Sequence, residues 1–137
     1  MAVNRRQARV LAVQAFYHHE FHRDEVLDAL RELADDADAD LGTRDYASRL
    51  CRWFVADEPR IDALIASVLQ ERTLKRVELL GRIVLRLGTA ELLGGETPPK
   101  VVIDEAIEIA RLYGSPDTAK FVNGVLDAVM RRIAEGA

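Results

Sequence analysis

Apolar residues recur at spacings of three and four along most of the chain, which is the pattern of helices that bury one face. In the segment 98–126 this pattern predicts two helices joined by a tight corner. Gly114 follows the last apolar turn of the first helix, where a residue with positive φ commonly ends a helix. Ser115 and Pro116 then fit the N-cap and the first position of the second helix. We therefore expect a capped helical corner at 114–117.

Asn123 and Gly124 interrupt the apolar pattern of the second of these helices. Inside a helix, glycine is less favourable than alanine by about 1 kcal/mol. A glycine kept at that cost indicates that another backbone comes close to it, or that Asn123 has a polar task. We expect close packing of a neighbouring helix at Gly124.

The chain before residue 98 predicts five further helices. Four of them begin at a residue suited to a helix start, and these residues are Asn4, Asp24, Thr43 and Pro59. The fifth covers about 77–93 and is apolar around most of its circumference, so we expect it to be the central helix. Its polar side chains should face outward, namely Arg82, Arg86 and Glu91.

Gly81 and Gly88 lie seven residues apart on one face of this central helix, where they would let a neighbouring helix approach closely. No segment alternates as a strand does, and no internal repeat is present. About seven helices with short connections predict a compact all-α bundle. The length of 137 residues fits a single domain, 1–137, with a real core.

Composition restricts the possible settings of this domain. No apolar run approaches the roughly 18 residues that a membrane-spanning helix needs, and no signal peptide is evident at the N-terminus. Cys51 is the single cysteine, so an internal disulfide is impossible, which fits a reducing compartment. We therefore expect a cytoplasmic protein without a membrane contact.

The distribution of charge is more informative than its total. The net charge is −4, yet residues 1–19 contain Arg5, Arg6 and Arg9 and no acid, which gives this segment +3 and the remainder −7. A basic end on an acidic body is the footprint of an anion-binding surface. Guanidinium groups one helical turn apart can fork onto phosphate oxygens. The alternative is an ordinary solvated first turn.

Motifs for catalysis or metal binding are incomplete in this sequence. His18 and His22 are one helical turn apart, but a zinc site needs three or four ligands. The acidic run 36–40 resembles the start of a calcium loop without its glycine and its final glutamate. Phosphate-binding glycine loops and a nucleophile elbow are absent. We expect no enzyme activity, no metal and no cofactor.

Several motifs resemble the NusB family of bacterial transcription antitermination factors. They lie in order along nearly the whole chain, in segments 5–9, 12–17, 84–92, 98–106 and 120–127. The resemblance implies an all-helical RNA-binding domain without catalysis. It further implies binding to the single-stranded boxA element of nascent ribosomal RNA leader transcripts, together with the ribosomal protein that acts as NusE. This pair would join NusA, NusG and RNA polymerase and suppress premature termination.

The same resemblance assigns roles to particular residues. It implies RNA contacts at Arg5, Arg6, Arg9, Tyr17, Asp117, Thr118, Lys120 and Phe121, with the corner residues facing the arginines of the first helix. It places NusE on the central helix at Arg82, Arg86 and Glu91. Unstacked bases of single-stranded RNA can stack on aromatic and guanidinium planes, while a carboxylate can accept from a base amino group. Phe121 could equally be a core residue, and Asp117 a helix-start acid.

Two other functions remain open at this point. One is a NusB-like domain of the kind fused to ribosomal RNA cytosine methyltransferases, which would make the chain part of an enzyme. The other is a protein-binding helical module, for example a homodimer that covers the RNA-binding face.

Overall fold

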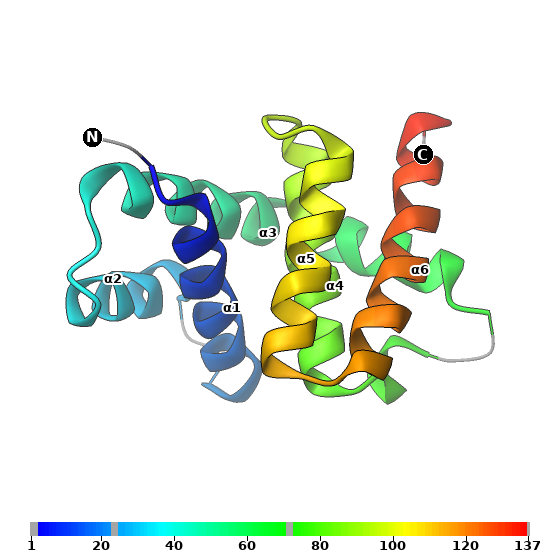
Figure 1. Ribbon diagram of the computed structural model, residues 1–137, viewed down its shortest axis with the longest axis horizontal. Coiled ribbons are helices and arrows are strands. Elements are labelled where there is room, and N and C mark those ends of the chain that lie inside the picture. Colours follow the sequence, from blue (N-terminus) through cyan, green and yellow to red (C-terminus); the bar gives the residue numbers. More distant parts are fainter. Residues whose placement is uncertain (1–2, 23–24, 71–72, 137) are drawn as a thin grey trace. The chain divides into compact units, whose positions relative to one another are not determined.

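The computed structural model describes residues 3–22, 25–70 and 73–136, and within them the chain is helical (Figure 1). These residues form six α-helices and one short 3-10 helix, and they contain no strand, as the sequence predicts. The chain divides into two compact units, Met1–Ala56 and Asp57–Ala137. None of the described helices is long and apolar enough to cross a membrane.

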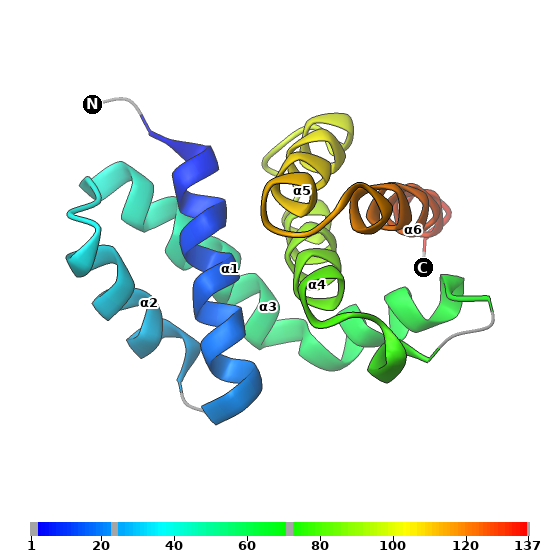
Figure 2. The same ribbon diagram turned by 60° about the horizontal axis from the view of Figure 1, so that its bottom comes forward.

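The first unit contains α1, α2 and the first part of α3. Their bounds are Arg5–His22 for α1, Val26–Asp36 for α2 and Leu41–Val68 for α3. Figure 2 shows α1 and α2 side by side within this unit. The rings of Phe16 and Phe54 are stacked in the core, with centroids 4.3 Å apart, and join α1 to α3. Both side chains are buried, which explains the apolar spacing of the two helices.

Helix starts in this unit confirm one predicted cap and correct another. Asn4 Oδ1 accepts a hydrogen bond from Gln7 N at 2.9 Å, so Asn4 caps α1 as predicted. The prediction for Thr43 is wrong, because α3 begins at Leu41 and Asp40 Oδ1 accepts from Thr43 N at 2.8 Å. These bonds from the Thr43 backbone and hydroxyl lower the pKa of Asp40. Asp24 lies outside the described residues.

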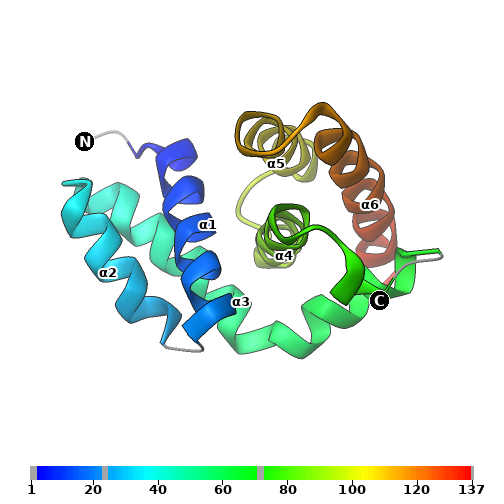
Figure 3. The same cartoon turned by 90° about the horizontal axis from the view of Figure 1, so that it is seen from below.

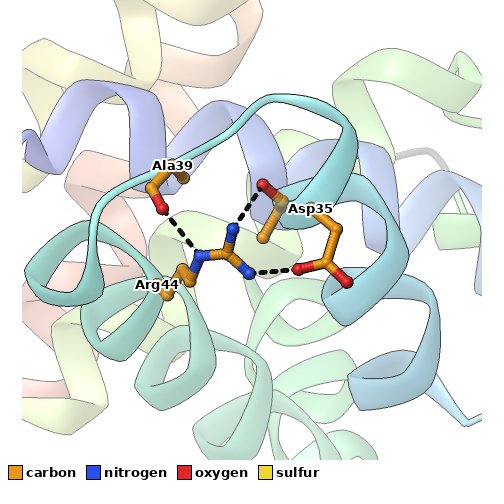
Figure 4. Close-up of polar contacts among 4 residues, drawn as sticks. Asp35, Ala39 and Arg44 are labelled. Atoms are coloured by element: carbon orange, nitrogen blue, oxygen red, sulfur yellow. Dashed lines mark hydrogen bonds and ion pairs between the residues drawn. The ribbon is translucent and has the colours of Figure 1, made fainter.

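Arg44 fastens the end of α2 to α3 (Figure 4). Its Nε donates to Ala39 O at 2.7 Å and its Nη2 to Ala34 O at 3.1 Å, while Nη1 pairs with the Asp35 carboxylate. The last carbonyls of a helix lack intrahelical partners and carry negative partial charge, which a cation offsets. Arg44 therefore stabilises a helix end that lies within an acidic run.

The predicted third and fourth helices are one bent helix. Within α3, Asp57 has non-helical angles of φ −132° and ψ 24°, two residues before Pro59. A proline lacks the N–H that a helix interior uses and disfavours helical angles in the residue before it. This kink accounts for six described α-helices where the sequence predicts about seven, and it falls at the boundary of the two units.

The second unit is built around α4. After the 3-10 helix Leu74–Arg76, the helices are Leu79–Gly94 for α4, Pro99–Tyr113 for α5 and Pro116–Ala134 for α6. Figure 3 shows α5 and α6 packed against two sides of α4. Most residues of α4 are buried, which confirms a helix that is apolar around most of its circumference. For the same reason the prediction that Glu91 faces outward is wrong, since Glu91 is 1% exposed.

A glycine permits close packing between two helices of this unit, but it is Gly88 and not Gly124, where the sequence predicts it. A Cβ on Gly88 would lie 2.7 Å from Leu126 Cδ1, so α4 and α6 touch at Gly88 as expected. A Cβ on Gly124 would have no described neighbour within 4 Å, so the predicted close approach at Gly124 is wrong. Gly114 has a φ of −119°, not a positive φ, and a Cβ there would lie 2.7 Å from Ala110 O.

Substitution of Gly88 tests this packing. Gly88→Val should lower the free energy of unfolding by about 1–3 kcal/mol, because Leu126 is fully buried and has little room to move away. The measurement is urea unfolding followed by circular dichroism. The matched control is Gly124→Val, which should change the free energy of unfolding by less than about 0.5 kcal/mol. Equal stability of the Gly88 variant and the native chain would contradict the assigned contact.

Candidate nucleic-acid interface

The three arginines of α1 lie in two different environments. Arg5 and Arg6 are exposed in the first turn, directly after the Asn4 cap. Arg9, one turn later, is only 3% exposed. The first turn of α1 therefore carries two exposed arginines. In this conformation Arg9 supports the turn from beneath, and its predicted RNA contact stays a prediction.

Tyr46 of α3 packs beneath these arginines. The guanidinium carbon of Arg5 lies 4.5 Å from the centroid of the Tyr46 ring, and that of Arg9 lies 5.9 Å from it. A cation over an aromatic face is attracted by the ring quadrupole, by about 0.5–1 kcal/mol at exposed sites. Tyr46 is buried, and Trp53 meets its ring edge-on with centroids 6.3 Å apart. The neighbours of the Tyr46 ring hold it in place, and the ring in turn orders the first turn of α1, which we call the arginine turn.

Hydrogen bonds connect the starts of α1 and α3 in the same region. Asn4 N donates to Thr43 Oγ1 at 3.1 Å, and Thr43 is fully buried. Because Asn4 also caps α1, this bond fixes the first turn of α1 against α3. The sequence predicts Thr43 as a cap and assigns no role to Tyr46. No local pattern could show that both residues hold the arginines, because the contacts join residues about forty positions apart in sequence.

Aromatic rings continue the exposed surface of α1. Tyr17 is 39% exposed and follows Arg6 by eleven residues, which places it on a similar face about 16 Å further along the helix. Its ring centroid lies 5.9 Å from that of Phe21, which is more exposed still. The sequence prediction includes Tyr17 but omits Phe21. The signal for Phe21 was its place one helical turn after Tyr17.

The corner between α5 and α6 holds the second group of predicted residues. Ser115 Oγ accepts from Thr118 N at 3.2 Å, which confirms the predicted cap. Thr118 is buried and its Oγ1 donates to the Glu78 carboxylate at 3.3 Å, so it fixes the corner and does not face solvent. Asp117 and Lys120 are exposed on the first turns of α6, and Phe121 is half-buried.

An open pocket of about 520 Å³ lies beside this corner, and we call it the α6 pocket. It is lined by Val68 at the end of α3, by the next two residues, 69–70, and, on α6, by Lys120, Phe121, Gly124, Val125 and Ala128. Two of the eight predicted RNA-binding residues thus border one cavity within the second unit. The arginines and Tyr17 share α1 in the first unit.

The residues predicted to contact NusE make contacts within the second unit itself. Arg86 donates to both carboxylate oxygens of Asp62, at 2.9 and 3.1 Å, and its side chain is 14% exposed. Arg82 Nη1 donates to Lys75 O at 3.1 Å and is half-buried. Glu91 is buried, as described above. Arg86 and Glu91 therefore help to shape the second unit, whereas the hydrogen bond of Arg82 lies at the surface.

Other candidate chemistry does not assemble in the described part of the chain. Within that part, no group of three or more His, Cys, Asp or Glu residues could hold a metal ion. The rings of His18 and His22 stack on each other, with centroids 4.5 Å apart. Burial raises the pKa of Cys51 to about 12, so its thiol stays protonated and is not a nucleophile.

Comparison with known proteins gives consistent matches. A model of the NusB family matches residues 6–131. The transcription antitermination protein NusB of Thermotoga sp. (strain RQ2) is 41% identical over 135 residues, which cover 98% of this chain and 95% of that protein. The solved structure of T. maritima NusB has a TM-score of 0.88 at 38% identity, and the match covers 96% of this chain and 93% of that chain.

A second solved structure contains antitermination factors NusB and NusE in complex with dsRNA. It matches this fold with a TM-score of 0.86 at 25% identity, over 93% of this chain and 96% of that chain. The similarity to that chain therefore extends over nearly all of the fold.

The role of Tyr46 can be tested by a double-mutant cycle with Arg5. Tyr46→Leu and Arg5→Ala should show a coupling energy of about 0.5–1 kcal/mol in the free energy of unfolding, because the guanidinium lies over the ring. Urea unfolding of the four proteins measures it. The control cycle pairs Tyr46→Leu with Arg31→Ala on α2, where the effects should add. Strict additivity in the Arg5 cycle would refute the contact.

Proposed function

Because this chain belongs to the NusB family, we propose that it is a transcription antitermination factor that binds boxA RNA of ribosomal RNA leader transcripts. We propose further that it binds this RNA together with the ribosomal protein NusE. The proposal assigns no catalytic step to the chain and places it in the cytoplasm. Binding of NusA, NusG and RNA polymerase in a larger complex belongs to the same proposal.

The observation that carries the proposal is the ordered arginine turn of α1. Two exposed arginines, Arg5 and Arg6, begin a helix whose first turn is held by a cap, by Thr43 and by the Tyr46 ring. Positive charge at a helix N-terminus opposes the helix dipole, so this arrangement costs some stability. A phosphate bound there would remove that repulsion and accept hydrogen bonds from both arginines.

Aromatic and polar groups would complete the recognition of single-stranded RNA. On α1, Tyr17 offers an exposed ring for stacking. On α6, Phe121 borders the α6 pocket, Lys120 offers a charge to phosphate, and the exposed Asp117 carboxylate can accept from a base amino group. Recognition of this kind needs unpaired bases, because side chains cannot read the deep groove of an RNA duplex.

NusE binding is proposed on the α4 side of the second unit. Its support is the match to the solved complex that contains NusB and NusE. Of the three residues assigned to this contact, Arg82 would meet the partner, whereas Arg86 would act through its ion pair with Asp62. Glu91 would contribute only by holding α4 in place, since its side chain is buried.

RNA binding with matched variants tests the proposed function. The native chain, alone and with NusE, should bind single-stranded boxA RNA more tightly than a scrambled RNA of the same composition, measured by fluorescence anisotropy. Arg5→Ala with Arg6→Ala should weaken binding about tenfold or more, because two charged hydrogen-bond donors are lost. The slope of log affinity against log salt should fall by about 1.

Arg31→Ala with Arg52→Ala is the matched control. It also removes two positive charges from the first unit, but from exposed positions on α2 and α3. This variant should bind within about twofold of the native chain, since long-range charge is screened beyond roughly 10 Å. Equal affinity for boxA and scrambled RNA at every salt concentration, with and without NusE, would overturn the proposed function.

A further inference from the structure

We propose that a pocket between α2 and α3 binds a small organic molecule that carries a phosphate monoester, such as a nucleoside monophosphate. We call it the α2–α3 pocket, and it is lined by three arginines, one serine and three apolar side chains. All of them belong to the first unit, and none is among the residues assigned above to RNA or NusE. The inference therefore goes beyond the proposed function and does not rest on it.

Each wall of the pocket is one face of a helix. Arg44, Ser48 and Arg52 follow one another at intervals of four, so they form a row along α3. From Arg44 to Arg52 this row measures about 12 Å along the helix axis. The wall on α2 also repeats at helical spacing and consists of Leu27, Leu30, Arg31 and Ala34. The volume of about 290 Å³ lies at the lower limit of pockets that hold small ligands.

The charge of the lining selects for an anion. It contains three arginines and no acidic residue. Arg52 is exposed and forms no ion pair with any residue that the structure describes. Arg31 lies 3.7 Å from the Asp28 carboxylate, and both side chains are largely exposed, so this pair contributes little. The like charges of the pocket repel one another, and a bound anion would remove that repulsion.

Arg44 is held in a fixed position within this group. Its bonds to Ala39 O, Ala34 O and the Asp35 carboxylate use three of the five N–H donors of the guanidinium group (Figure 4). Two donors remain for a ligand. Because the end of α2 already orders this side chain, ligand binding would cost little further conformational entropy at Arg44.

Ser48 supplies an uncharged donor between two of the arginines. Its side chain is half-buried, and its hydroxyl forms no hydrogen bond with a residue in the described ranges. A half-buried hydroxyl gains from a partner, and it can donate to an oxygen of a bound anion. The position of Ser48 in the middle of the row on α3 places this donor where arginines from both walls border the same cavity.

This combination favours a phosphate monoester over a carboxylate. A monoester carries a charge of about −1.5 to −2 at pH 7 and three acceptor oxygens, which suits several arginines and a hydroxyl. A carboxylate offers one charge and two oxygens. The apolar side chains of Leu27, Leu30 and Ala34 cannot bond to the phosphate, but they can pack against the organic part of the ligand.

Isothermal titration calorimetry of the full chain with three probes tests the proposal. Adenosine 5′-monophosphate should bind with a dissociation constant of about 1 mM or lower. Inorganic phosphate should bind about tenfold more weakly, because it lacks the part that packs against the leucines. Adenosine should show no saturable binding, because it lacks the charge that the arginines select.

Variants of the lining residues locate the binding site. Arg31→Ala with Arg52→Ala should weaken the binding of adenosine 5′-monophosphate about tenfold or more. Ser48→Leu keeps every charge but fills the pocket, and it should weaken binding to a similar extent. The matched control is Arg49→Ala, since Arg49 follows Ser48 directly, pairs with Asp45 at 2.6 Å and does not line the pocket. This control should bind within about twofold of the native chain.

Three results would each overturn the proposal. The first is the absence of saturable binding of adenosine 5′-monophosphate up to about 10 mM. The second is equal affinity for this nucleotide and for inorganic phosphate. The third is an equal loss of affinity in Arg49→Ala and in the double arginine variant, which would indicate general surface charge. If Ser48→Leu does not fold, as judged by circular dichroism, the double arginine variant decides. RNA affinity enters none of these results, so failure of the proposed function is detected separately.

Discussion

Burial of α4 on nearly all sides is the constraint on which the second unit depends. A helix of this kind can accept neighbours only where its own side chains are small, and Gly88 is the place where Leu126 of α6 fits. Once α6 is fixed at that point, the Ser115 corner and the Glu78–Thr118 hydrogen bond have a defined position. The exposed face of α6 is then presented with little freedom of its own, as a binding surface requires.

In the first unit, polar groups rather than apolar packing hold the candidate binding surface in place. A series of hydrogen bonds runs from Gln7 N to Asn4, from Asn4 N to Thr43 and from Thr43 N to Asp40, so that the starts of α1 and α3 are joined. Thr43 is the buried member of this series, and it has a hydrogen-bond partner on each side, as a buried polar group requires. Together with the Tyr46 ring, this series offsets the unfavourable charge of two arginines at a helix N-terminus.

Local patterns were sufficient to predict the helices, two of their caps and the all-α class, because apolar spacing and capping depend on neighbouring residues. They failed where the answer depended on a distant segment. Two residues near one helix start could both be caps, and Asp40 rather than Thr43 takes that place because α3 begins at Leu41, which puts Thr43 inside the first turn. Likewise, sequence alone could not tell which glycine meets a neighbouring helix, since this depends on the facing side chain.

In the candidate site, too, some features follow from neighbouring residues and others depend on distant segments. Exposed charge at Arg5 and Arg6 follows from their place before the apolar face of α1, whereas burial of Arg9 and Thr118 depends on their surroundings in the folded units. The particular roles in RNA and NusE binding came from family resemblance and stay predictions. Tyr46 and Phe21 enter only through contacts and exposure that no short motif encodes.

Gly124 has a consequence for how this protein would respond to selection in the laboratory. Because its position tolerates a side chain without strain, selection for thermal resistance alone should readily replace it with alanine or a larger helix former. Selection for growth that depends on RNA binding should retain it if the space beside it is used. Gly124 therefore costs α6 stability that the packing of the helix does not require.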